Sequence, residues 1–165
     1  MKKFLRIILS MIICVSLCAC GSSGNKSNTS KEKEQDINNV IVDNDCVKIT
    51  IEKKYEKPDV TRIDVGYLVL VENKTDKEIS FYFENVDVDG FTVDTLIATE
   101  GTVGNSTVEA GKKSYFYLKF YAEEIVKCID DLKEVSALVE IKEVASKSGD
   151  IVRYNLVDSI DVKIE

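Results

Sequence analysis

The stretch YLVLVENKTDKEISFYF, from Tyr67 to Phe83, decides the fold class of this chain. Its first half carries apolar side chains on both faces of an extended strand, which is typical of a strand in the middle of a sheet. The polar segment NKTDK at 73–77 then predicts a turn. In the second half, Ile79, Phe81 and Phe83 alternate with more polar residues and share one face. The stretch therefore predicts two β-strands joined by a short turn.

Runs of the same kind continue on both sides of this stretch. Each alternates apolar with polar residues and is bounded by a turn signal, such as Gly111 in VEAGKK or the segment Lys147–Gly149. The runs are VKITIEKKY (47–55), SYFYLKFY (114–121), EVSALVEIKEV (134–144) and IVRYNLVDSIDVKI (151–164). Together they predict an all-β domain of about seven or eight strands.

One segment breaks the alternation. AEEIVKCIDDLKE (122–134) places Ile125, Ile129 and Leu132 at helical spacing behind two acids, so it predicts a short helix or helical turn. Antiparallel strands with one such crossover predict an immunoglobulin-like β-sandwich of two sheets. A closed barrel is the alternative, because a single sequence does not identify the edge strands.

The segment NVDVDGFTVD (85–94) has the spacing of acids that opens a calcium-binding EF-hand loop. An EF-hand also requires a bidentate carboxylate at the twelfth position, which here is Leu96. Asp89 and Gly90 instead form a strong signal for a type I′ turn, which would place the apolar residues of both arms on one face. We therefore predict a β-hairpin here and no metal site.

The strand phase changes at the start of this hairpin. Inward-facing residues are odd-numbered up to Phe83 and even-numbered from Val86, which predicts a bulge or strand break near Asn85. The predicted pairing also puts Asn85, Asp87 and Asp94 on one outward patch. Weak cation binding at that patch stays open at this point.

The first twenty residues indicate export. MKKFLR is basic, and Ile7–Leu17 is an apolar run that is long enough for a secretory signal but too short to span a bilayer as a helix. The following residues, LCACG, resemble a bacterial lipobox, with a small residue before Cys20 and glycine after it. That resemblance implies lipidation of Cys20, because Cys14 and Cys18 each follow a bulky residue. An ordinary secreted protein, cleaved near Ala19, is the alternative.

The segment 21–35, GSSGNKSNTSKEKEQ, lacks large apolar groups and predicts a flexible linker. We divide the chain accordingly: a lipoprotein signal peptide at 1–19, the lipidated Cys20 with a polar linker at 20–40, and the β-sandwich domain at 41–165. Two acyl chains would hold such a protein stably on the extracytoplasmic face of the cell membrane.

Composition excludes several kinds of chemistry. The chain has 165 residues, no histidine and a formal net charge of −7. Histidine is the usual general base and the commonest metal ligand, so its absence removes most triad and zinc chemistry. An acidic protein of this kind repels nucleic acid, so we expect no nucleic-acid partner. No phosphate loop or repeat is found, and we predict no cofactor.

The chain resembles small Gram-positive bacterial lipoproteins that carry one immunoglobulin-like domain of the telokin-like or immunoprotective-antigen type. The resemblance is carried by LCAC at 17–20, the polar linker, YLVLVENKTDKEISFYFENVDVDG (67–90) and VEAGKKSYFYLKF (108–120). It covers most of the chain, and its motifs are structural. The resemblance implies a fold and a location, and it supplies no catalytic residues.

Cys46 and Cys128 are the cysteines left for the folded domain, and an exported compartment permits a disulfide between them. Spacing alone does not show whether they pair. Without a histidine to act as a base, a nucleophilic role for Cys128 is disfavoured.

The most suggestive surface is the row Tyr115, Tyr117 and Tyr121. Alternation puts these residues opposite the inward Phe116 and Leu118, so they form an aromatic outer face that could bind a protein or a glycan. The alternative is that a neighbouring segment covers them. We therefore expect a non-enzymatic binding or interaction module at the cell envelope. The alternatives are an envelope hydrolase that uses carboxylates, or an accessory subunit of a transport system.

Overall fold

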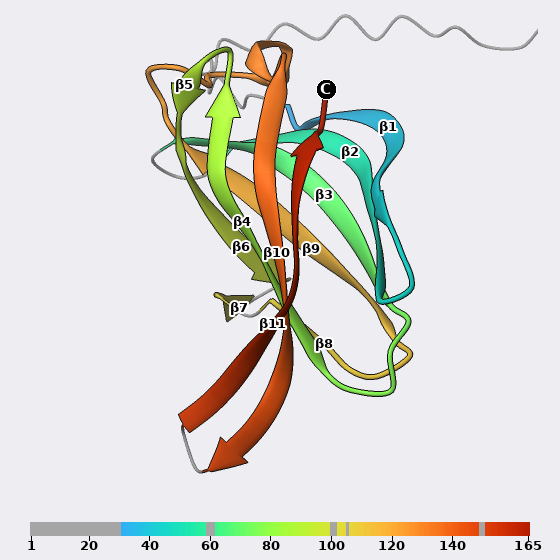
Figure 1. The fold of residues 1–165 in the computed structure, drawn as a ribbon. Helices are drawn as coiled ribbons and strands as arrows, with labels where there is room; N and C mark the ends of the chain where they lie inside the picture. Colours follow the sequence, from blue (N-terminus) through green and yellow to red (C-terminus); the bar gives the residue numbers. More distant parts are fainter. Residues whose placement is uncertain (1–30, 59–61, 100–101, 105, 149–150) are drawn as a thin grey trace, which may run out of the picture.

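The computed structural model describes residues 31–58, 62–99, 102–104, 106–148 and 151–165, and within them the chain forms a sandwich of two antiparallel sheets (Figure 1). The first sheet, here called sheet A, has the order β1-β2-β3-β9-β6-β7. Its strands are β1 (Lys33–Asp43), β2 (Val47–Pro58), β3 (Ile63–Asn73), β9 (Lys113–Tyr121), β6 (Asp94–Thr99) and β7 (Thr102–Val103).

The second sheet, sheet B, has the order β11-β10-β4-β5, and the short β8 also pairs with β4. Its strands are β11 (Ile151–Lys163), β10 (Val135–Ser148), β4 (Ile79–Val88), β5 (Phe91–Thr92) and β8 (Thr107–Val108). The predicted immunoglobulin-like antiparallel β-sandwich is confirmed. The described strands number eleven because β5, β7 and β8 are two-residue strands that alternation does not detect.

The two sheets enclose one core built from the alternating residues. Phe81 of β4 and Phe116 of β9 meet across it at a centroid distance of 4.8 Å with nearly perpendicular rings, an arrangement that aromatic pairs favour. Tyr67 packs edge-on against Phe120 at 5.7 Å. Burial of apolar area at these positions is the main force that holds the sheets together.

Of the short helix or helical turn predicted at 122–134, the structure has the helical turn. The segment makes a turn at 123–125 and a three-residue 3-10 turn, η1 (Ile129–Asp131), between β9 of sheet A and β10 of sheet B. Ile129 and Leu132 are nevertheless buried. Their spacing therefore reflects the packing of this crossover segment against the core, and not an α-helix.

The hairpin at 85–94 has the predicted turn. Asp87 pairs with Thr92 and Val88 with Phe91, and Asp89 and Gly90 both have positive φ, as type I′ requires. Val86, Val88 and Val93 are buried, but Phe91 is 59% exposed, so one apolar residue of the hairpin is not in the core. The predicted bulge is also present. The register between β4 and β10 shifts there, and Asn85 has φ 49°.

Strand β1 corrects the predicted end of the linker. It begins at Lys33 and pairs with β2 from Lys33↔Glu56 to Asp43↔Lys48, so residues 33–40 belong to the sheet and not to a tether. Its sequence is polar because it is an edge strand with most side chains exposed. The signal peptide at 1–19, Cys20 and the linker up to residue 30 lie outside the described residues. In the part that is described, no helix has the length and apolar character to cross a membrane.

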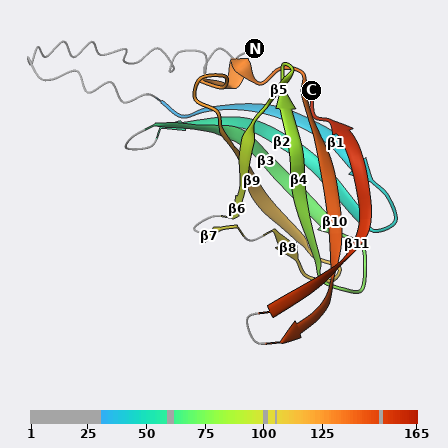
Figure 2. The same ribbon diagram turned by 60° about the vertical axis from the view of Figure 1, so that its left-hand side comes forward.

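Strands β10 and β11 extend beyond the sandwich as a two-stranded arm, which we define as residues 144–148 and 151–157 (Figure 2). Ser148 still pairs with Ile151, so Lys147 and Ser148 are in the strand and not in the predicted turn. The arm lies at the end of the molecule opposite η1 and residue 165 (Figure 1).

Candidate binding surfaces

The predicted row of tyrosines lies on the outer face of sheet A. Tyr115 and Tyr117 stand opposite Leu70 and Leu68 of β3, while Phe116 and Leu118 between them are buried in the core. Tyr121 continues the row, beside Asp94 of β6. Alternation therefore placed all three residues on the correct face. We call Tyr55, Leu68, Leu70, Tyr115, Tyr117 and Tyr121 the tyrosine face.

Tyr55 is the residue of this face that the sequence did not identify. A bulge in β2 between Ile51 and Lys53 shifts the phase, so Tyr55 lies on the outer face and is opposite Gly66. A Cβ at Gly66 would approach the backbone oxygen of Leu118 to 2.1 Å and the Tyr55 hydroxyl to 2.9 Å, so only glycine fits there. Tyr55 is 2% exposed, and burial raises its pKa, with the charge of Asp64 adding to the effect.

The row of tyrosines is not equally available. The Tyr117 ring packs edge-on against Tyr55 at 5.2 Å, and the Lys57 ammonium lies 5.2 Å from its centroid. The guanidinium of Arg62 lies 4.6 Å from the Tyr121 centroid, and the hydrogen bond that Arg62 donates to the Tyr121 phenol oxygen raises the pKa of Arg62. Tyr115 is 53% exposed and is the open member of the row.

Two basic residues beside the tyrosine face, Arg62 and Lys119, are held by one carboxylate. Asp64 accepts a hydrogen bond from Arg62 Nε at 3.1 Å and from Lys119 Nζ at 2.7 Å. The covering groups are thus cations held in place beside aromatic rings. The side chains of Lys57 and Arg62 lie against Tyr117 and Tyr121, but Tyr121 is still 38% exposed and Tyr115 is 53% exposed.

A second site that the sequence did not identify is charged and lies between the sheets. The same bulge in β2 turns Lys54 and Glu56 inward, opposite Tyr67 and Val65, and leaves them 7% and 4% exposed. Lys54 Nζ donates to the Leu132 carbonyl at 2.6 Å and forms an ion pair with Glu165.

Glu56 is held in the same way. It accepts from Lys33 Nζ at 3.2 Å and from the Ile129 amide at 3.4 Å. The two charged residues of β2 therefore fasten β1, η1 and residue 165 at one end of the sandwich. Because each charge is paired and hydrogen-bonded, removal of either partner would leave a buried charge without compensation.

The candidate disulfide is not formed, and Cys46 and Cys128 are both free thiols. Cys46 directly precedes β2, whereas Cys128 precedes Ile129, which contacts Glu56 near the other end of β2. Nine residues of strand separate the two ends by about 30 Å. A disulfide requires Cα atoms within about 7 Å, so these thiols cannot meet in this fold.

The outward patch of Asn85, Asp87 and Asp94 is not assembled as predicted. Asp87 pairs within sheet B, and its Oδ1 accepts the Gly90 amide at 2.7 Å. The chain changes sheets at Val93, so Asp94 pairs with Tyr121 of sheet A. Within the described ranges, no group of three or more His, Cys, Asp or Glu side chains is arranged to hold a metal ion.

Carboxylates also border a pocket of about 440 Å³ beside this hairpin. Asp87, Glu134 and Glu165 line it together with Lys163. Asp87 already holds the turn, and Glu165 pairs with Lys54. Two of the three carboxylates therefore have structural roles, and the pocket gives the hydrolase alternative no specific support.

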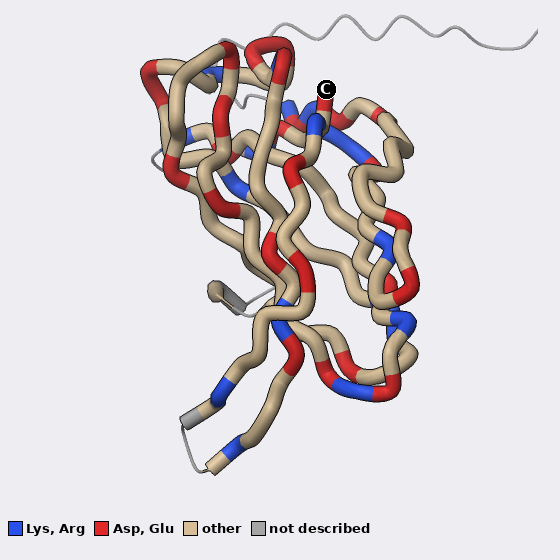
Figure 3. Tube along the Cα trace, viewed as in Figure 1, with Lys and Arg blue, Asp and Glu red and all other residues tan. Residues whose placement is uncertain are grey.

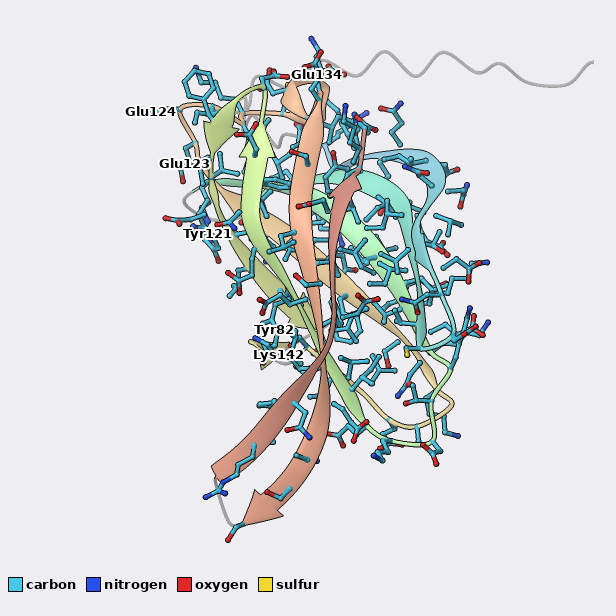
Figure 4. The ribbon with its side chains drawn as sticks, viewed as in Figure 1. Tyr82, Tyr121, Glu123, Glu124, Glu134 and Lys142 are labelled. Atoms are coloured by element: carbon cyan, nitrogen blue, oxygen red, sulfur yellow. The ribbon has the colours of Figure 1, made fainter. Side chains whose placement is uncertain are left out.

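The outer face of sheet B carries an aromatic and basic group at the base of the arm (Figure 4). The Lys142 ammonium lies 4.6 Å from the Tyr82 centroid and pairs with Glu140 at 2.6 Å. Burial raises the pKa of Tyr154 on β11, and the Tyr82 phenol beside it adds to the shift. The three side chains Tyr82, Lys142 and Tyr154 thus join β4, β10 and β11 on one face.

Comparison with known proteins gives little beyond the chain itself. No protein-family model matches it, and no curated protein sequence matches it. Among solved structures, the chain is similar to the crystal structure of the yeast GGA1 GAE domain, with 8% sequence identity and a TM-score of 0.41 over 78% of this chain and 100% of that chain. The immunoglobulin-like architecture therefore rests on the sheet order and strand register of this chain.

Proposed function

We propose that the protein is a lipoprotein of the cell membrane, anchored through acylated Cys20, whose extracytoplasmic β-sandwich is a non-enzymatic binding or interaction module at the cell envelope. The observation that carries the binding role is the tyrosine face. It presents Tyr115 at 53% exposure beside Leu70, on a framework of rings and cations that is already ordered. Rigid aromatic side chains give large contact area at a small entropy cost, which is why they dominate protein interfaces.

The mechanism is positional. The acyl chains would keep the domain near the membrane, and the tyrosine face would hold a protein or glycan partner there. Tyr117 and Tyr121 act as positioning residues, because Tyr55, Lys57 and Arg62 fix their rings. Tyr115 supplies the open contact.

Retention of envelope components on the immobilised domain tests the binding role. The domain, residues 21–165, contains every described strand. We expect Tyr115→Ala to lower the recovery of a bound component by about tenfold, because central aromatic contacts contribute roughly 1–2 kcal/mol. The matched control is Phe91→Ala, which removes an aromatic side chain of similar exposure, 59%, from sheet B. Equal recovery by wild type and Tyr115→Ala would exclude the tyrosine face as the contact.

Fractionation of cells tests the anchor separately. We expect Cys20→Ser to move the protein from the membrane to the soluble fraction, and Cys18→Ser to leave it on the membrane. Membrane retention of the Cys20→Ser variant would contradict lipidation at this residue. The binding role does not depend on this result.

A further inference from the structure

The arm has a strand edge that nothing in the described chain covers. Strand β11 is the last strand of sheet B, and it pairs with β10 on one side. On its other side, β1 of the opposite sheet lies alongside only the later residues, through Asn44 to Asp158 and Asn39 to Ile164. Among the described residues, no strand pairs with the open side of Ile151–Val157.

This edge is also apolar. Leu156 is 59% exposed, Val157 41% and Tyr154 37%, all on one short piece of β11. A two-stranded hairpin with both faces in water is marginally stable, and an open strand edge is a template for another strand. The arm therefore combines free backbone hydrogen-bonding groups with exposed apolar side chains, as sites of strand addition do.

The charge on the β11 edge indicates which kind of partner strand would bind there. The stretch Ile151–Val157 has one charged residue, Arg153, for which no ion pair is found in the described part of the chain. The Lys147 ammonium of the arm already pairs with Glu78 at 2.8 Å. The arm itself contains no Asp or Glu among residues 144–148 and 151–157, and Figure 3 shows basic residues on it, whereas acidic residues are spread over the rest of the molecule. An acidic residue opposite Arg153 would complete the edge.

A second copy of the chain does not supply that residue. Antiparallel self-pairing centred on Tyr154 would put Arg153 opposite Asn155, and centring on Asn155 would put it opposite Val157. Neither register puts an acid opposite Arg153, so self-pairing leaves this charge without a partner.

We propose that the free edge of β11, Ile151–Val157, binds an extended acidic segment of a partner protein by antiparallel strand addition. Backbone hydrogen bonds would supply most of the affinity, the face with Tyr154 and Leu156 would take alternate apolar side chains, and Arg153 would pair with a partner carboxylate. This inference is independent of the Cys20 anchor and of the tyrosine face, so each can fail without the others.

Two synthetic peptides test the proposal on residues 21–165. Both are nine residues long and alternate valine with a charged residue, glutamate in one and lysine in the other. We expect the glutamate peptide to slow hydrogen exchange of backbone amides in Ile151–Val157 and to bind about fivefold more tightly than the lysine peptide, which is what an exposed ion pair supplies. Arg153→Glu should reverse this preference. Because Arg153 is exposed, this substitution leaves the core untouched.

The controls make the outcome decisive. A glutamate peptide with N-methylated backbone amides cannot add as a strand, and it should give no protection. Equal protection by the methylated peptide, protection confined to other strands, or no protection by either peptide at millimolar concentration would each overturn the proposal. Sedimentation of the protein without peptide is the last measurement. If the protein is a dimer and Arg153→Glu makes it a monomer, the edge binds a second copy and the proposal is overturned.

Discussion

The two halves of strand β11 both pair with β10, but they differ in burial and in what borders their other edge. From Asp158 onward it is bordered by β1, and Val162 and Ile164 are buried in the core. From Ile151 to Val157 no strand of the described chain borders its other side, and Tyr154, Leu156 and Val157 are exposed. A register shift at Val157 separates the halves. One strand can therefore have two roles although its pairing with β10 is continuous. The later half packs in the core, whereas the first half adds little to the core and can contact another molecule.

The largest expected effect comes from shortening Ile164, which directly follows the buried half of β11, in comparison with Leu156 in the exposed half. Ile164→Ala should lower the free energy of unfolding by about 3 kcal/mol, because the fully buried residue leaves a cavity. Leu156→Ala should change it by less than about 0.5 kcal/mol. Urea unfolding followed by circular dichroism measures both. Similar losses for the two variants would show that the arm is part of the cooperative core.

A smaller effect is expected from the asparagines. Asn44 Oδ1 accepts the amides of Cys46 and Val47 at 2.9 and 2.8 Å, and its Nδ2 donates to Asp158 at 2.9 Å. Asn44→Ala should therefore cost about 1–2 kcal/mol. Asn155→Ala, in the exposed half, is the matched control and should be neutral. If Asn44→Ala also leaves the unfolding free energy unchanged in thermal and urea unfolding, the contact of Asn44 with Asp158 does not stabilise the later half of β11.

We expect acidic pH to lower the stability of the end of the sandwich that contains η1, because Asp131 becomes protonated. Hydrogen bonds from the Lys127 and Cys128 amides lower the pKa of Asp131 below its usual value of 3.8. A carboxylate with a lowered folded pKa stabilises the fold above the unfolded pKa, and this stability is lost as pH falls through the folded pKa. Asp131→Asn should cost about 1 kcal/mol at pH 7 and less near pH 2. The exposed neighbour variant Asp130→Asn serves as the control, and a constant difference between Asp131→Asn and wild type across this range would contradict the assignment.

The smallest effect is expected from removing the arm. Replacing residues 146–153 with a two-residue turn should change the unfolding free energy by less than about 1 kcal/mol, since an exposed pair such as Lys147–Glu78 contributes little. Calorimetry of this variant and of wild type gives the difference. A loss of several kcal/mol would mean that the arm supports the sandwich, and the contrast between the halves of β11 would fail.

The sequence predicted the features that depend on local alternation. The strands around Phe81 and Phe116, the turn at Asp89 and Gly90, and the bulge at Asn85 all follow from side-chain period and turn chemistry. These features need no knowledge of distant residues.

The features it missed depend on a shift in phase or on a distant partner. The bulge after Ile51 places Tyr55 outside and Lys54 inside, and the run KKYEK contains no turn residue to announce it. Strand β1 was assigned to the linker because its residues are polar. The alternating acids Glu34 and Asp36 were the available signal: Asp36 is opposite Lys53 of β2, and Glu34 forms an ion pair with the same lysine at 2.8 Å. The separation of Cys46 from Cys128 required the whole fold.

The position of Lys33 determines how the molecule would respond to force. Strand β1 begins at the end that holds η1 and residue 165, whereas the arm points the opposite way (Figure 1). A pull on the N-terminal side of Lys33 against a load held at the arm would run along the strands. The hydrogen bonds between β1 and β2 would then be sheared together instead of being unzipped one at a time. The same two strands that close the sandwich would thus make it a mechanically stiff link between a tether and whatever the arm holds.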